Sequence, residues 1–370
     1  MADHRTSAGR GIDLIWPGEL LSPFRPPILI YLDLNHWINL AKASLQRGSP
    51  QYDALLLALR AARSRRSIRI VLSISLVEEL SAIKNPRQRD ELVALIDELS
   101  DFEYLAGLGD VFRLELQTFL NTRMGGRGMG WNPIPLVGRS MLHGFGKVGD
   151  LKILKDATGE DITDQARAKP FRGDPSWFEK LERRAERELL AGPRDSDIEE
   201  LRAAGYRPER PRQSHHNNVL IEQYFADELL DQHWRKGRLL DVVAARHVSL
   251  ELIDMLTVEL MARAITLSEV MSATTHVLEL PLSMPASAVF VGIKTQYHRD
   301  RNRKWTDNDL HDISAMALAI PYCDVVYTDA SVRNAAITAG LDKLMGTRLP
   351  RSPLEMAQLV EQANGESPSD

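Results

Sequence analysis

The chain has 370 residues, of which 44% are apolar and 26% are charged, and its formal net charge at pH 7 is −5. This length allows two domains, or one domain that carries a large insertion. A net charge this small excludes a polycation that coats nucleic acid, so any phosphate-bearing partner must meet a local basic patch. The single cysteine, Cys323, excludes an internal disulfide and a thiolate-rich zinc site.

The N-terminal segment does not have the pattern of an export signal. Residues 1–21 are polar and lack the apolar stretch of a signal peptide. No run along the chain approaches the roughly 20 apolar residues of a membrane span. We therefore expect a cytoplasmic protein that makes no membrane contact.

Strand and helix patterns alternate in the first part of the chain. After two prolines, Ile28–Leu32 has the pattern of a short buried strand that ends at Asp33, and an amphipathic helix follows. Apolar residues recur at intervals of three and four over Tyr52–Arg66, which indicates a helix. The segment SIRIVLSIS predicts a second apolar strand, and helices follow over LVEELSAI and Arg89–Leu99. This alternation predicts βαβ units and a parallel sheet.

The alternation stops in the middle of the chain and resumes near its end. Residues 106–286 are predicted to be mainly helical, with amphipathic helices joined by long loops. Beyond them, a helix over ISAMALA precedes the strand CDVVYT, and KLMGTRL predicts a last strand before a final helix. The predicted fold is therefore α/β, with a parallel sheet flanked by helices. Its domain is divided between residues 26–105 and 287–364, and residues 106–286 form a helical insertion.

Acidic residues occupy comparable places on these elements. Asp33 and Asp329 each follow a strand, at the carboxyl end where open parallel sheets bind ligands. Asp309 and Asp312 share one face of a helix, and a pair of glutamates opens the helix after the second strand. Carboxylates packed together repel and raise one another's pKa unless a cation neutralises them. Because Mg²⁺ and Mn²⁺ favour carboxylate and water oxygens, the pattern predicts a divalent-cation site.

Four motifs resemble, in their order along the chain, those of PIN-domain nucleases. They are Asp33 followed by Asn35, SISLVEEL, DNDLHDISAMALA and VVYTDASVRNAA. The resemblance implies that Asp33, Glu79, Asp312 and Asp329 bind Mg²⁺ or Mn²⁺ and form the catalytic site. Asn35 takes the place of a small polar residue of the family and is expected to contact the substrate. The long middle segment departs from the small members of the family.

Neighbouring acids leave two choices of ligand open. Glu79 is preferred to Glu78 because Glu-Leu is the commoner text in the family, and Asp309 is a rival or a helper of Asp312 as a metal ligand. The plainer alternative is that Asp33, Asp309 and Asp312 cap helices or interact with helix dipoles. The coincidence of four acids on separate elements favours the metal site.

A basic segment, YHRDRNRKW, directly precedes the acidic helix. Positive charge interleaved with aromatic rings is how single-stranded nucleic acid is commonly held, whereas a solvated loop is the plain alternative. The position beside the acidic helix favours substrate binding. The residues that we expect to bind RNA are Arg299, Arg301, Arg303, Lys304 and Trp305.

Taken with the resemblance, these patterns predict a Mg²⁺- or Mn²⁺-dependent nuclease that hydrolyses RNA phosphodiesters, with DNA a less favoured substrate. The resemblance implies products with a 5′-phosphate and a 3′-hydroxyl, and by analogy a toxin or phage-defence role. The alternative function is a catalytically silent PIN-like module that binds RNA or a protein partner. The sequence leaves open whether the helical insertion selects substrate, makes a homo-oligomer or receives an inhibitory protein partner.

Overall fold

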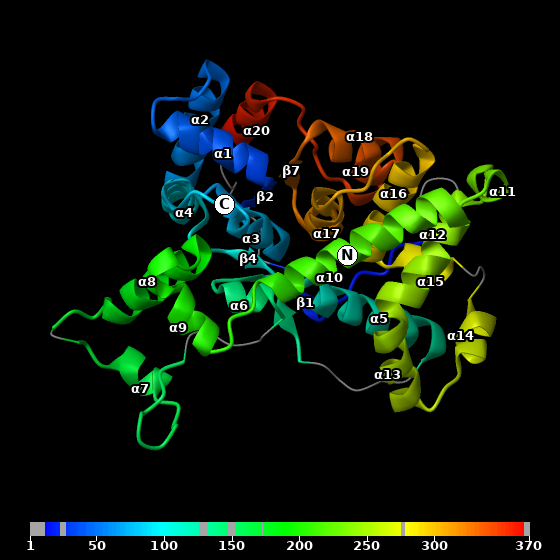
Figure 1. Ribbon diagram of the computed structural model, residues 1–370, viewed down its shortest axis with the longest axis horizontal. Coiled ribbons are helices and arrows are strands. Elements are labelled where there is room, and N and C mark those ends of the chain that lie inside the picture. Colours follow the sequence, from blue (N-terminus) through cyan, green and yellow to red (C-terminus); the bar gives the residue numbers. More distant parts are fainter. Residues whose placement is uncertain are drawn as a thin grey trace.

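A small parallel sheet lies at the centre of an otherwise helical molecule (Figure 1). The computed structural model describes residues 12–22, 27–125, 132–146, 152–171, 173–274 and 278–365. The sheet has the order β3 (Ile68–Val71), β2 (Ile28–Leu32), β7 (Val325–Tyr327), and all three strands are parallel. Single parallel bridges extend it, from Leu72 to Tyr104 beyond β3 and from Val325 to Arg348 beyond β7. The described residues thus form an α/β fold.

Helices cover both faces of the sheet, because β2 is apolar on both sides. Leu29 and Tyr31 belong to one buried cluster, whereas Ile30 and Leu32, which point the other way, belong to a second. Residues from α5 (Leu108–Met124), α16 (Pro285–Arg299) and α17 (Asp307–Tyr322) fill the first cluster. Residues from α1 (Leu34–Ser44), α2 (Pro50–Ser64), α4 (Pro86–Ser100) and α20 (Pro353–Gly365) fill the second.

Two further helices begin at the carboxyl ends of strands. Helix α3 (Ile74–Ser81) follows β3, and the Ser73 hydroxyl caps it by accepting from the Leu76 N–H at 3.2 Å. Helix α18 (Ala330–Thr338) follows β7. The chain turns from strand to helix at these points, and this brings the first turns of α1, α3 and α18 to one edge of the sheet.

The middle of the chain is mainly helical, as predicted, with short strands at its start. Strand β1 (Leu20–Leu21) pairs in parallel with β5 (Ile134–Pro135), and β4 (Tyr104–Leu105) pairs antiparallel with β6 (Val137–Gly138). The helices are α6 (Met141–Gly144), α7 (Thr163–Ala168), α8 (Trp177–Ala191), α9 (Ile198–Ala203), α10 (Glu209–Tyr224), α11 (Gln232–Arg235), α12 (Leu239–His247), α13 (Ile253–Arg263), α14 (Leu267–Ala273) and α15 (Glu279–Ser283). A 3-10 turn, Asp195–Asp197, precedes α9, and π-helical turns at Phe225–Leu229 and Val248–Leu252 follow α10 and α12.

The middle segment shares its core with the α/β part. Val111 and Phe119 of α5 are fully buried in the cluster that contains Val289 of α16 and Ile313 of α17. The predicted boundary at 286/287 falls inside α16, and β6 pairs with the strand just before the boundary at 105/106. That residues 26–105 and 287–364 form one domain and residues 106–286 a separate insertion stays a prediction.

The strand predicted over KLMGTRL is wrong. Residues Leu341–Met345 form helix α19, between Gly340 (φ 72°) and Gly346 (φ 73°). Both glycines adopt left-handed backbone, which suits a short helix with sharp ends better than a strand. Only Arg348 reaches the sheet, where its N–H donates to the Asp324 carbonyl at 3.0 Å.

None of the described helices is both long enough and apolar enough to cross a membrane.

Candidate metal centre

Two aspartates of the site sit where strands turn into helices. Asp33 is the N-cap of α1, and its Oδ1 accepts from the Leu34 N–H at 2.7 Å. Asp329 is the N-cap of α18, and its Oδ1 accepts from the Val332 N–H at 2.9 Å. The Asp33 N–H donates to the Tyr327 carbonyl at 3.0 Å, which fixes the end of β2 against the end of β7. The sheet therefore holds the two carboxylates side by side.

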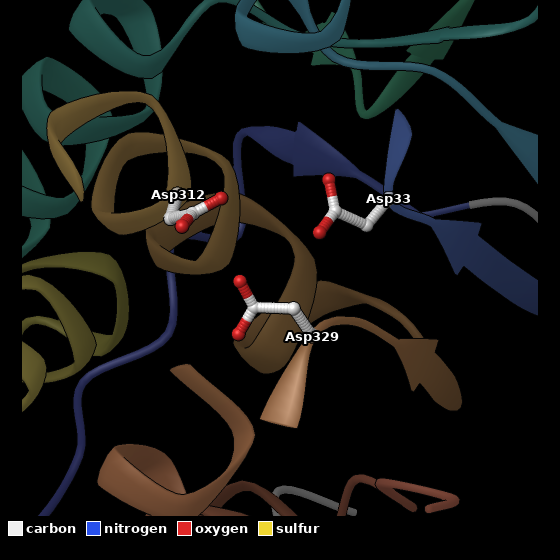
Figure 2. Close-up of side chains that lie close together, drawn as sticks. All are labelled: Asp33, Asp312 and Asp329. Atoms are coloured by element: carbon white, nitrogen blue, oxygen red, sulfur yellow. The ribbon is translucent and has the colours of Figure 1, made fainter. Parts of the chain in front are cut away.

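A third aspartate approaches them from α17. Figure 2 shows Asp33, Asp312 and Asp329 pointing their carboxylates toward one another. One ligand oxygen from each lies within 4.8 Å of the others, although most of the chain, including the middle segment, separates Asp33 from Asp329. Oxygens around one Mg²⁺ lie about 3 Å apart in cis and about 4 Å apart in trans, given bonds of about 2.1 Å. Three side chains of the oxygen-donor type that suits Mg²⁺ or Mn²⁺ thus converge within a limit close to the spacing of oxygens around one ion.

Burial and neighbouring carboxylate charges raise the pKa of Asp33 and of Asp312. Burial raises the pKa of Asp33 to about 6, and the charge of Asp329 adds to this, while the hydrogen bond from Leu34 opposes it. Burial and the charges of Asp33 and Asp329 raise the pKa of Asp312 to about 9. A divalent cation would remove this repulsion and replace the lost hydration of the three oxygens. The residues present therefore fit a hard divalent cation.

The structure distinguishes the two adjacent glutamates of α3. Burial and then the charges of Asp33 and Asp329 raise the pKa of Glu79 to about 8. Glu78 is exposed, and its carboxylate lies 3.3 Å from His311 Nδ1. Glu79 faces the aspartates, but it is not among the three side chains whose oxygens lie within 4.8 Å of one another.

Asp309 is placed apart from the three aspartates. Its carboxylate accepts from the N–H and the hydroxyl of Thr306, at 2.8 and 3.0 Å, and pairs with the Arg303 guanidinium. It forms a capping box at the start of α17. The expectation that Asp309 is a metal ligand is not supported by this geometry, because the Arg303 guanidinium already neutralises its carboxylate. Spacing of three on a helix put Asp309 and Asp312 on one face, but it could not show which of them is the cap.

The basic segment before α17 divides into two kinds of residue. Trp305 is buried, with 6% of its surface exposed, and packs against Tyr297 and His298 at 5.9 and 4.6 Å between ring centroids. The expectation that Trp305 stacks on RNA bases is therefore wrong, since a core ring has no free face. Arg303 stacks over the Tyr297 ring at 3.4 Å, in addition to pairing with Asp309.

The other predicted substrate-binding residues are exposed. Arg299 is exposed at the end of α16, and Arg301 and Lys304 are exposed between α16 and α17. Asn35 is exposed on the first turn of α1, two residues after Asp33, and its carbonyl accepts from the Asn39 side chain at 2.8 Å. Lys304 lies 3.9 Å from the Asp227 carboxylate. All four side chains are exposed to solvent, and substrate contact by them stays a prediction.

Sequence reasoning missed two buried groups beside the aspartates. Tyr31 precedes Asp33 by two residues on the same face of β2, and its hydroxyl lies 3.1 Å from the Ser73 hydroxyl. Burial and the charge of Asp33 raise the pKa of Tyr31. His36 lies on α1 one turn after Asp33 and stacks on Tyr327 at 3.5 Å, and burial lowers its pKa to about 4. The alternation of β2 and the spacing of three on α1 were signals that could have found them.

Comparison of the chain with protein-family models, with curated proteins and with solved structures gave no match. The arrangement of the site therefore has to carry the functional argument by itself.

Proposed function

We propose that this protein is a nuclease that depends on Mg²⁺ or Mn²⁺, hydrolyses RNA, and has a PIN-like α/β domain. The observation that carries the proposal is the convergence of Asp33, Asp312 and Asp329 at the carboxyl end of a parallel sheet. They come from three separate segments, so their meeting is a property of the fold and not of local sequence. The raised pKa values of Asp33 and Asp312 show that the site is electrostatically costly unless something positive occupies it.

In this proposal the chain's residues have distinct parts. Asp33, Asp312 and Asp329 would hold the cation, which when bound supplies positive charge for the phosphodiester and acidifies a water molecule. Glu79, whose pKa is raised to about 8 without a cation, would be mostly protonated at neutral pH, and it could take up a proton only once a bound cation has lowered that pKa. The exposed Arg299, Arg301 and Lys304 would attract the RNA backbone. RNA is preferred over DNA only on the resemblance to the nuclease family.

The test is RNA cleavage by the full chain with Mn²⁺, with and without EDTA, followed by mapping of the cut ends. We expect cleavage that EDTA abolishes, with 5′-phosphate and 3′-hydroxyl products. Asp329→Asn is nearly isosteric but carries no charge, so it should lower cleavage about 100-fold or more. Asp156→Asn changes an exposed aspartate of the middle segment and serves as the matched control.

Melting with and without Mn²⁺ separates the enzyme from a silent binding module. In the wild type, Mn²⁺ at about 100 times its Kd should stabilise the fold by about 2.7 kcal/mol, and Asp329→Asn should lose most of that. If the wild type binds RNA but neither cuts it nor responds to Mn²⁺, then Asp33 and Asp329 act only as helix caps, and the proposal fails.

A further inference from the structure

Helix α10 of the middle segment crosses the near face of the molecule and contacts α17, the helix that carries Asp312 (Figure 1). Most of α10 is exposed, and Val219 and Glu222 are its only buried residues within the described chain. His215, Val219 and Glu222 recur at intervals of four and three, so they lie on one side of the helix. Contact between α10 and the protein body therefore depends on a few side chains.

The end of α10 is firmly attached. The Glu222 carboxylate is buried and accepts from Lys294 at 2.9 Å, from Arg246 at 3.0 Å, and from the His298 ring at 3.1 Å. Lys294 and His298 belong to α16, so the contact joins the middle segment to the α/β part. A fixed end keeps the earlier turns of α10 at a constant position beside α17.

The middle of α10 contacts the first turns of α17. The rings of His215 and His311 are stacked, with centroids 3.9 Å apart and planes 12° from parallel. His215 Nε2 lies 2.9 Å from the Asp307 carbonyl, so its N–H donates there. Gln223 accepts from the Trp305 N–H at 2.9 Å. These contacts bracket the start of α17, one and a half turns before Asp312.

The same stack reaches the helix that carries Glu79. His311 Nδ1 lies 3.3 Å from the Glu78 carboxylate of α3. His311 immediately precedes Asp312, and Glu78 immediately precedes Glu79. The pair of rings therefore involves or contacts the residues that immediately precede Asp312 and Glu79, and it connects α10, α17 and α3 through successive contacts.

We propose that His215 is a positioning residue of the metal centre, which makes the middle segment a part of the site. It holds the first turns of α17 through the His311 ring and the Asp307 carbonyl, and so keeps Asp312 directed at Asp33 and Asp329. The inference rests on the proposed metal-dependent function. Linkage makes the effect reciprocal: if docking of α10 favours the cation, the cation must favour docking of α10 by the same factor.

The experiment compares His215→Ala with His216→Ala in the full chain. His216 is the next residue and is exposed. It reaches α17 only through an exposed pairing with the Asp307 carboxylate at 3.8 Å, which contributes little to stability, so it is a matched control. Mn²⁺ is titrated by calorimetry, and hydrogen exchange over residues 209–224 is measured with and without Mn²⁺. We expect His215→Ala to weaken Mn²⁺ binding about fivefold or more. In the wild type and in His216→Ala, Mn²⁺ should slow exchange in α10, and in His215→Ala it should not.

A second variant, which keeps the hydrogen bond to the Asp307 carbonyl, provides a test if His215→Ala fails to fold. His215→Gln retains a donor for the Asp307 carbonyl but has no ring, so its Mn²⁺ affinity should lie between those of His215→Ala and the wild type. Equal Mn²⁺ affinity in the wild type and in folded His215→Ala or His215→Gln would overturn the inference and leave the metal centre standing. A wild type that does not bind Mn²⁺ overturns both the inference and the proposed function.

Discussion

Asp33 and Asp329 each cap a helix and face the candidate metal centre at the same time. One oxygen of each carboxylate accepts from a backbone N–H of the helix that follows. A cap and a helix dipole both favour a charged carboxylate, yet the pKa of Asp33 is raised to about 6. Burial and the neighbouring aspartate therefore outweigh the cap. Capping and metal binding are not alternatives here, because each carboxylate has a second oxygen that the cap does not use.

The raised pKa of Asp312 predicts how metal-free stability depends on pH. Its pKa rises from 3.8 in the unfolded chain to about 9 in the fold, so its contribution is complete below about pH 4 and is lost as the pH rises toward 9. Asp312→Asn cannot ionise and avoids this loss. At about 1.4 kcal/mol per pH unit, the free energy of unfolding of the variant should gain on the wild type by up to about 4 kcal/mol between about pH 6 and about pH 9. Urea titrations in EDTA at several pH values measure it.

A comparison isolates this effect from the other buried groups. Glu115 also has a pKa raised to about 8, but it is unchanged in Asp312→Asn, so it cancels in the difference between variant and wild type. Asp156→Asn should run parallel to the wild type at every pH. A difference that stays constant from pH 6 to pH 9 would mean that Asp312 is already ionised and well solvated.

At the scale of elements, the segment between α16 and α17 holds two arginines in opposite settings. Arg303 stacks on Tyr297 and pairs with Asp309, which is 7% exposed, whereas Arg301 is exposed. Removing one partner of a buried ion pair leaves the other charge uncompensated. The two residues look alike in the sequence, but in the fold Arg303 pairs with the start of α17, whereas Arg301 points into solvent.

Arg303→Ala and Arg301→Ala should therefore differ in kind. Arg303→Ala should lower the free energy of unfolding by about 3 kcal/mol, because Asp309 loses its partner and Tyr297 loses its cation. Arg301→Ala should change it by less than about 0.5 kcal/mol. It should instead weaken RNA binding and reduce the slope of log K against log salt by about 0.7, the effect of one lost phosphate contact. Urea unfolding and RNA binding at several salt concentrations measure the two.

The roles are exchanged if Arg301→Ala unfolds easily while Arg303→Ala remains stable and binds RNA poorly. That result would place Arg303 at the RNA and contradict the ion pair with Asp309.

Patterns in the sequence located the parallel strands β2 and β7 and the helices beside them, because apolar runs and capping residues are local signals. The same signals placed Asp33 and Asp329 together, since parallel strands carry their carboxyl ends to one edge. Asp312 was preferred to Asp309 only on the resemblance to the nuclease family. They failed at two places. Trp305 was predicted to bind RNA because the sequence does not show that the neighbouring residues of α16 enclose its ring in the core. KLMGTRL was predicted to be a strand because its apolar residues do not reveal that Gly340 and Gly346 adopt left-handed backbone at the two ends of a short helix.

At the scale of the whole molecule, the middle segment and the α/β part are joined through buried contacts. Phe112 of α5 packs edge-on against Phe290 of α16, with centroids 6.0 Å apart. The Glu115 carboxylate of α5 is fully buried and accepts from the Ala286 N–H at 2.8 Å and from the Tyr322 hydroxyl at 2.6 Å. The Glu115 carboxylate thereby connects the start of α16 to the end of α17. Helices α5, α16 and α17 together cover one face of the central sheet, so burial of that face depends on α5.

We therefore expect that the middle segment cannot be removed. A chain in which a flexible Gly-Ser linker replaces residues 108–283 loses all of α5, including Val111, Phe112 and Phe119 from the core. Truncating one such side chain costs about 2–5 kcal/mol, and a domain has only about 5–15 kcal/mol in total. The full chain should unfold in one cooperative transition by circular dichroism, and the shortened chain should show none. A shortened chain that melts cooperatively and is stabilised by Mn²⁺ would establish residues 106–286 as a separable insertion, and would also exclude His215 as a positioning residue, since the metal centre would then form without α10.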